Sequence, residues 1–182
     1  MFSSIQQHEP QLFLQLGDLH YSGSNWLKES EFEFALREVF SKNPVQREFY
    51  QSTPLSYVFD DHDFGSNNAD GRSKSRDKVN RAYRNNVRQV DLDSGVYHSF
   101  EVPVANGFKL KFIVIDVRTF KNESQNYGEE QLAWLKQELT DADHPDSKVA
   151  GVFLVHSWPW KTRREWQSKH SEEATLMKRL ER

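Results

Sequence analysis

The sequence predicts one α/β domain, built from buried strands and amphipathic helices. The almost wholly apolar run 112–115 is typical of a strand that helices cover on both faces, and 148–155 is predicted to be another buried strand. The segments 28–40 and 129–140 carry apolar residues at helical spacing. Acidic residues or a histidine directly follow four of the predicted strands, and functional sites of α/β folds lie at such strand ends.

The individual elements follow from periodicity and from turn residues. Strands are predicted at 12–16, 57–59, 95–102, 109–117 and 148–155, with Asn106-Gly107 marking a hairpin turn. Helices are predicted at 28–40, 79–90 and 129–140, with one further helical turn at 46–50. The polar residues 1–11 are expected to be frayed, residues 141–147 to form a linker, and residues 165–182 to form a charged helical tail.

The composition excludes several classes of protein. The chain of 182 residues has no cysteine, so disulfides, thiolate metal sites and cysteine nucleophiles are absent. A net charge of −3 argues against a general nucleic-acid binder. No apolar run is long enough to span a membrane, and the N-terminus lacks the pattern of a signal peptide. As given, the chain is therefore expected in the cytoplasm.

An unusual acidic stretch follows the strand at 57–59. Asp60, Asp61 and Asp63 surround His62 in the sequence. Like charges at such short spacing repel one another. Such a group is tolerated if it points into water, or if cations lie among the carboxylates. The histidine and the position at a strand end favour the second interpretation, a metal site.

Three other strand ends offer matching side chains. They are Asp18 with Tyr21, Asp116 with Arg118, and His156. Hard oxygen ligands with imidazole suit Zn, Fe, Mn or Ca, and a carboxylate shared by two such cations is typical of two-metal hydrolytic sites. Beside them, His62 could donate a proton to a leaving oxygen. The alternatives are a local Asp116–Arg118 ion pair and a core or capped histidine at position 156.

A basic segment follows the acidic stretch. Asn67 and Asn68 precede Arg72, and further arginines continue to Arg88. Guanidinium and amide groups beside a metal cluster suit a phosphate anion. The alternative is a solvated basic helix, and a third hypothesis is a site for RNA or another anionic ligand along residues 72–88.

The blocks around these residues resemble the PhoD-like (alkaline phosphatase D) metallophosphatases. The resemblance covers about residues 12–160 and rests on Gly17-Asp18-Leu19-His20-Tyr21, Asp60-Asp61-His62-Asp63-Phe64-Gly65 with Asn67-Asn68, Ile115-Asp116-Val117-Arg118, and Gly128 and Gln131 with Trp134-Leu135. It implies a calcineurin-like phosphoesterase fold, a sandwich of two mixed sheets with flanking helices. It also implies a centre of two divalent or trivalent metal ions and the hydrolysis of phosphomonoesters or phosphodiesters.

The resemblance also implies roles for individual residues. Asp18 would bridge the two metals, Tyr21 would bind one of them, Asp61 would be a ligand, and His62 would contact the transition state. The expected site therefore has four metal ligands, Asp18, Tyr21, Asp61 and His156. His62 and Arg118 are expected to be catalytic, and Asn67, Asn68 and Arg72 to bind the phosphate group of the substrate.

Two motifs of this family are not found in the sequence. Its members carry an earlier strand with a metal-binding motif and a later Gly-Asp-x-His motif, which supply further ligands. We therefore expect a truncated domain, with a core at about 12–160 and the tail at 161–182. The alternative to an active phosphoesterase is an inactive fragment or relative that serves as a binding or structural module.

Overall fold

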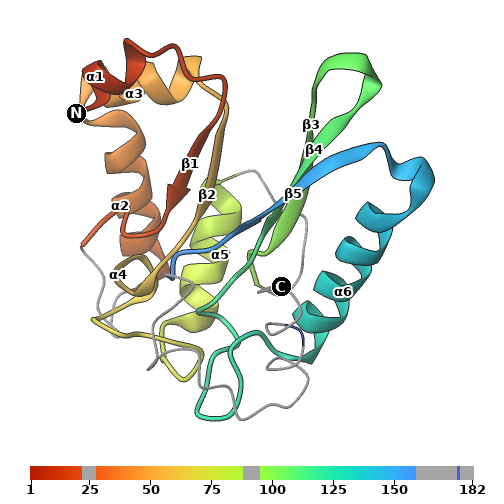
Figure 1. Ribbon diagram of the computed structural model, residues 1–182. Helices are drawn as coiled ribbons and strands as arrows, with labels where there is room; N and C mark the ends of the chain where they lie inside the picture. Colours follow the sequence, from red (N-terminus) through yellow and green to blue (C-terminus); the bar gives the residue numbers. More distant parts are fainter. Residues whose placement is uncertain (22–27, 88–94, 159–175, 177–182) are drawn as a thin grey trace.

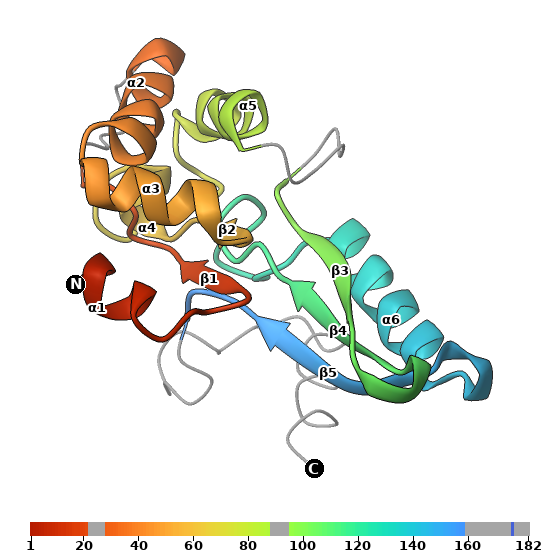
Figure 2. The same ribbon diagram turned by 90° about the horizontal axis from the view of Figure 1, so that it is seen from above.

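A computed structural model of the chain describes residues 1–21, 28–87, 95–158 and 176. Within these residues, five strands form two small sheets, which lie between helices (Figure 1). Helices α2 and α5 lie on one side of the strands and α6 lies on the other, as Figure 2 shows. The structure thus confirms the predicted α/β class and the helices on both sides of the strands. The prediction that residues 148–155 form a buried strand is wrong in part, because Val152 and Phe153 of that strand are 37% and 48% exposed.

The two sheets differ in strand direction. Strand β1 (Phe13–Leu16) is parallel to β2 (Leu55–Val58), and Leu16 is the register partner of Val58. In the second sheet, β3 (His98–Pro103) is antiparallel to β4 (Lys109–Val114), which is parallel to β5 (Val149–Val155). The second sheet is therefore mixed, whereas the first is wholly parallel.

The β3–β4 connection contains the predicted hairpin turn. A short 3₁₀ segment, η1 (Ala105–Gly107), joins the two strands. Asn106 has a φ of 61° and Gly107 a φ of 74°, and these left-handed conformations are the ones that Asn-Gly pairs favour. The Asn-Gly pair therefore predicts this turn correctly.

The main helices lie where the periodicity predicts them, with shifted ends. They are α2 (Glu29–Ser41), α3 (Pro44–Ser52), α4 (Asp61–Phe64), α5 (Arg76–Asn86) and α6 (Glu129–Asp143). Helix α3 is longer than the turn predicted at 46–50. Its start is marked by Asn43, whose side-chain oxygen accepts the N–H groups of Val45 and Gln46, and by a proline at the first helical position.

Two regions, the N-terminus and the end of helix α6, differ from the prediction. The segment expected to be frayed contains helix α1 (Phe2–Gln6), because the ring of Phe2 packs against Phe13, Phe49 and Tyr50. Helix α6 continues through residues 141–143, the first three of the predicted linker 141–147. It ends before Pro145, which begins the 3₁₀ turn η2 (Pro145–Ser147), because a residue that precedes proline disfavours helical backbone.

Some expectations concern residues that the structure does not describe. The predicted helix 79–90 extends into 88–94, and the predicted tail 165–182 is described only at residue 176. Residues 88–90 of the predicted helix, and all of the predicted tail except residue 176, therefore lie outside the described residues. Among the described residues, no helix has the length and the apolar character that a membrane crossing needs.

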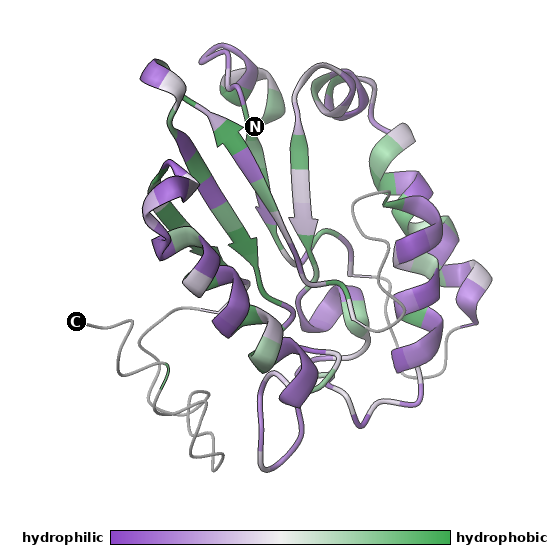
Figure 3. Ribbon diagram, turned by 90° about the vertical axis from the view of Figure 1, so that its right-hand side faces the viewer, coloured by the Kyte–Doolittle hydropathy of each residue, from purple (hydrophilic) through white to green (hydrophobic). Residues whose placement is uncertain are grey.

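Two apolar clusters hold the layers together. The first packs side chains of α2 and α5 against the strands, and it includes Phe32, Leu36, Tyr57, Phe59, Val79, Tyr83 and Val114. The second packs α6 against the opposite face of the mixed sheet, and it includes Ile113, Ile115, Leu132, Leu135 and Trp158. Neighbouring residues of β4 thus enter different clusters, which confirms burial on both of its faces. Figure 3 shows the apolar strands between helices that turn hydrophilic sides outward.

Candidate metal centre

The candidate site lies where the two parallel strands of the first sheet end. Because β1 and β2 are neighbours with the same direction, Asp18 and Asp60 leave the sheet at the same edge. Gly17 brings their loops together. It has a φ of 85°, and a Cβ atom there would lie 2.4 Å from Cβ of Asp60. A side chain at position 17 would therefore push the Asp18 loop away from Asp60.

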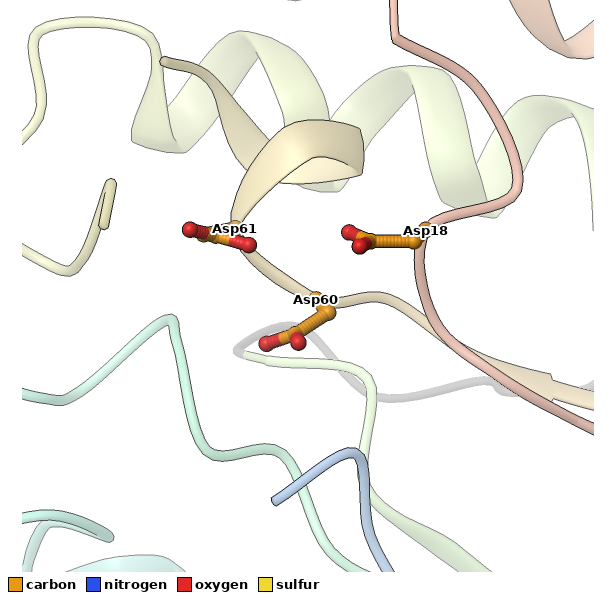
Figure 4. Close-up of side chains that lie close together, drawn as sticks. All are labelled: Asp18, Asp60 and Asp61. Carbon is orange, nitrogen blue, oxygen red and sulfur yellow. The ribbon is translucent and has the colours of Figure 1, made fainter. Parts of the chain in front are cut away.

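Three carboxylates converge at this edge. Asp18, Asp60 and Asp61 each offer an oxygen atom, and these atoms lie within 4.8 Å of one another. Figure 4 shows the Asp18 side chain directed from the loop after β1 toward Asp61. One oxygen of Asp18, Oδ1, is buried without a hydrogen-bond partner. A buried oxygen that lacks a donor among crowded carboxylates fits a cation ligand, and carboxylate oxygens are the ligands of hard cations.

Backbone N–H groups fix the Asp61 carboxylate. Asp61 is 8% exposed at the start of α4. Its Oδ1 accepts the N–H of His62 at 3.1 Å, and its Oδ2 accepts the N–H of Asn68, which has a φ of 60°. Each carboxylate oxygen accepts more than one hydrogen bond or metal contact, so these bonds orient Asp61 without saturating it.

Asp63 binds backbone N–H groups and is not one of the three clustered carboxylates. Its oxygens accept the N–H groups of His20, at 2.9 Å, and Asp60, at 3.1 Å. The side chain therefore ties the loop after β1 to the first turn of α4. Burial raises the pKa of Asp63 to about 7, although the backbone hydrogen bonds favour its charged form.

The third carboxylate, Asp60, binds Arg118. Nε of Arg118 donates to Oδ1 of Asp60 at 2.6 Å, and Nη2 contacts the same oxygen. Ser157 also donates to this oxygen, at 3.0 Å. Burial raises the pKa of Asp60, and the charge of Arg118 opposes this shift. The alternative of an Asp116–Arg118 ion pair is therefore wrong, because the guanidinium pairs with Asp60 and reaches Asp61 at 3.9 Å.

Asp116 positions the Arg118 loop through the backbone. It is fully buried, and it accepts the N–H groups of Val96, Arg118 and Thr119 at 3.0, 2.9 and 2.9 Å. Burial raises the pKa of Asp116, although these hydrogen bonds favour its charged form. Gln131 of α6 accepts the N–H of Asp116 and donates to its carbonyl oxygen, both at 2.8 Å. The loop after β4 is thus fixed on both sides.

Tyr21 and His62 lie side by side at the open edge of the cluster. Tyr21 is 70% exposed, and its hydroxyl donates to Oδ2 of Asp18 at 2.8 Å. This hydrogen bond raises the pKa of Tyr21. The centres of the Tyr21 and His62 rings are 4.4 Å apart. The structure therefore places the Tyr21 hydroxyl at Asp18 and the His62 ring beside the Tyr21 ring.

His156 follows β5 and is buried. It is not among the described side chains that form the carboxylate cluster. Its neighbour Ser157 contacts Asp60, so the end of β5 does reach the same edge of the fold. Burial lowers the pKa of His156 to about 4, so the imidazole is neutral near pH 7, as a metal ligand must be.

The residues predicted to bind phosphate are spread around the cluster. Asn67 and Asn68 are exposed in the loop after α4, and Asn68 touches the site through its N–H group. The guanidinium of Arg72 contacts two other carboxylates, Asp70 at 2.8 Å and Glu123 at 3.1 Å. Of these three residues, Asn68 is the one with a hydrogen bond to the carboxylate cluster.

Sequence reasoning misses two members of the site. It places Asp60 in the acidic stretch but not among the expected ligands. The position of Asp60 directly after the buried strand is the signal that could have identified it. Ser157 gives no such signal, because its contact with Asp60 joins residues 97 positions apart.

Comparisons with known proteins support the fold. No family model and no curated protein sequence matches the chain. A solved structure of PhoD is similar, with a TM-score of 0.66 and 14% sequence identity. The similarity covers 96% of this chain but 44% of that one, so the chain spans less than half the length of its structural neighbour. The chain has the fold of part of PhoD, two small sheets with flanking helices.

Proposed function

We propose that the chain carries part of a metal-dependent phosphoesterase site, which hydrolyses phosphomonoesters or phosphodiesters. The observation that carries this proposal is the convergence of Asp18, Asp60 and Asp61 at one strand edge, with Oδ1 of Asp18 buried and unpartnered. The PhoD-like fold and the motif resemblance support the same reaction class.

The residues that would hold the metal ions are Asp18 and Asp61, with Tyr21 and His156 completing the set from neighbouring loops. Bound cations supply positive charge that neutralises phosphate oxygens and lowers the pKa of water. Asp61 enters this site already oriented by two N–H groups. This order reduces the entropy that ligand binding costs.

Two side chains would act on the substrate directly. His62 lies at the exposed edge beside Tyr21, where its ring can give a proton to the leaving oxygen. Arg118 lies between Asp60 and Asp61, where its remaining N–H groups can contact a phosphate oxygen. Asn67, Asn68 and Arg72 would orient the rest of the phosphate group from the loop after α4.

The direct test is hydrolysis of p-nitrophenyl phosphate and bis(p-nitrophenyl) phosphate with Mn²⁺, Zn²⁺, Fe²⁺ or Ca²⁺. We expect metal-dependent turnover that Asp61→Asn abolishes and that His62→Gln lowers by about a hundredfold. Asp143→Asn is the matched control, because this exposed aspartate lies at the end of α6. A folded, metal-loaded chain without turnover would exclude catalysis by this chain.

A second candidate function is that of a non-catalytic binding or structural module. It is favoured by the Arg118–Asp60 pair, because a guanidinium among the carboxylates compensates their charge without a metal ion. This function predicts that EDTA leaves the unfolding midpoint unchanged and that added Mn²⁺ or Zn²⁺ does not raise it. The phosphoesterase proposal predicts a rise in the midpoint with each added metal that binds, and loss of this rise in Asp18→Asn.

A further inference from the structure

A separate cavity lies beside helix α5. It has a volume of about 330 Å³, and its lining comes from α5, from Gly95 and from the loop after β4. The lining includes three arginines of α5, namely Arg76, Arg81 and Arg84, together with Asn80, Thr119 and Phe120. None of them is a member of the carboxylate cluster.

Arg84 is the unusual residue of this cavity. Its Nη1 atom is buried and has no hydrogen-bond partner. A guanidinium N–H group that loses water without gaining an acceptor costs free energy, and the cost is larger for a charged group than for a neutral one. Arg84 also lines the cavity, so an oxyanion bound there would lie beside a guanidinium that has no carboxylate partner among the described residues.

The other two arginines have carboxylate partners. Arg76 pairs with Asp77 at 3.0 Å, and Arg81 pairs with Glu29 of α2 at 2.7 Å. Each guanidinium has five N–H donors, so one such contact leaves donors for a ligand. Three arginines against two carboxylates leave one positive charge, which belongs to Arg84.

The remaining walls limit the kind of anion. The hydroxyl of Thr119 donates to Oδ1 of Asn80 at 3.1 Å, which holds these two polar side chains together at the cavity. The Phe120 ring supplies an apolar surface. The volume exceeds what an inorganic oxyanion fills, so the cavity has room for an organic group beside the charged one.

We propose that this cavity, here called the α5 cavity, binds an organic phosphate-type oxyanion. Its oxygen atoms accept hydrogen bonds from Arg84 and Arg81, and its apolar group lies against Phe120. Guanidinium groups bind such oxygens with charge-assisted hydrogen bonds. The proposal does not depend on the phosphoesterase function, since no ligand of the candidate metal centre takes part.

The test uses phenylphosphonate and methylphosphonate, which contain no ester bond that the candidate metal centre could hydrolyse. Binding to the whole chain is measured by isothermal titration calorimetry in EDTA, so that added metal ions do not contribute. We expect saturable binding of phenylphosphonate, tighter than that of methylphosphonate. Because the contacts are charged, the affinity must fall as the salt concentration rises.

Three arginine variants locate the binding. Arg84→Gln is expected to weaken phenylphosphonate binding by about tenfold or more, the loss of one charge-assisted hydrogen bond. Arg81→Gln, at a half-exposed position, is also expected to weaken phenylphosphonate binding. This second variant keeps the test valid if Arg84→Gln does not fold. Arg47→Gln, an exposed arginine of α3, is the matched control and is expected to bind like the wild type.

The proposal fails if the folded wild-type chain shows no saturable binding at millimolar phenylphosphonate. It fails equally if Arg84→Gln and Arg81→Gln both retain wild-type affinity. An equal loss in Arg47→Gln would also overturn it, because it would indicate non-specific attraction to positive charge. Circular dichroism of each variant shows whether the compared chains are folded.

Discussion

The guanidinium of Arg118 lies against the carboxylate of Asp60, which is 58 positions earlier in the chain. Asp60 follows β2 of the first sheet, and Arg118 follows β4 of the second. Their side chains are 18% and 5% exposed. The pair therefore joins the two sheets at the edge where the candidate metal centre lies, and it places a cation among the carboxylates.

Removal of this cation should destabilise the fold. In Arg118→Met the carboxylate of Asp60 loses its buried partner, which costs about 3 kcal/mol in the free energy of unfolding. The double variant Asp60→Asn/Arg118→Met should recover part of this loss, because it leaves no unpaired charge. Urea unfolding of the single and double variants in EDTA measures the coupling. Strictly additive losses would show that the two residues do not depend on one another.

The close approach at Gly17 gives a second prediction. Gly17→Ala places a methyl group against Asp60, so we expect a loss of stability well above the cost of a left-handed alanine, which is about 1 kcal/mol. Gly107→Ala is the matched control, since its φ of 74° is similar and nothing lies within 4 Å of its added Cβ. If urea unfolding gave equal losses in both variants, backbone conformation alone would explain them. Metal-induced stabilisation should weaken in Gly17→Ala and persist in the control.

Local patterns predicted most of the fold. Apolar runs and helical spacing located β2, β4, α2 and α6, because the apolar residues that each of these elements buries form a pattern within a short stretch of sequence. Helix α1 could not be predicted in this way. It depends on contacts of Phe2 with Phe49 and Tyr50, which belong to a helix more than forty positions later.

The candidate site was predictable in part. Convergence of Asp18 and Asp61 follows from two neighbouring parallel strands, since such strands end at the same edge. The different partners of the three aspartates in the acidic stretch do not follow from the sequence. Asp60 meets Arg118, Asp61 faces Asp18, and Asp63 turns to the backbone of His20, because one turn of α4 sends neighbouring side chains in different directions.

The two hydrogen bonds between the Gln131 side chain and the backbone of Asp116, here called the Gln131 brace, give a third prediction. Gln131→Leu removes the side chain that bonds both backbone groups of Asp116, so we expect a loss of about 2 kcal/mol in unfolding free energy. Gln137→Leu is the matched control on the exposed side of α6 and should change stability little. Chemical denaturation compares the two variants. Equal stability of Gln131→Leu and the wild type would show that the brace contributes nothing.

The last prediction concerns the dependence of stability on pH. Burial lowers the pKa of His98 below the value of about 6.5 for an unfolded chain. Between these two pKa values the unfolded chain binds more protons, so the contribution of His98 to stability is complete above about pH 6.5 and is lost as the pH falls toward the folded pKa. His98→Gln cannot titrate there. Its unfolding free energy should therefore fall less than that of the wild type between about pH 7 and about pH 5.

The control for this prediction is His8→Gln, because His8 is exposed. His20 and His156, whose pKa values burial lowers to about 4, remain in all three proteins and add the same slope to each. The difference between wild type and His98→Gln therefore isolates one imidazole. Urea unfolding at several pH values measures it, and parallel curves for the two proteins would mean that His98 is as easily protonated in the fold as in the unfolded chain.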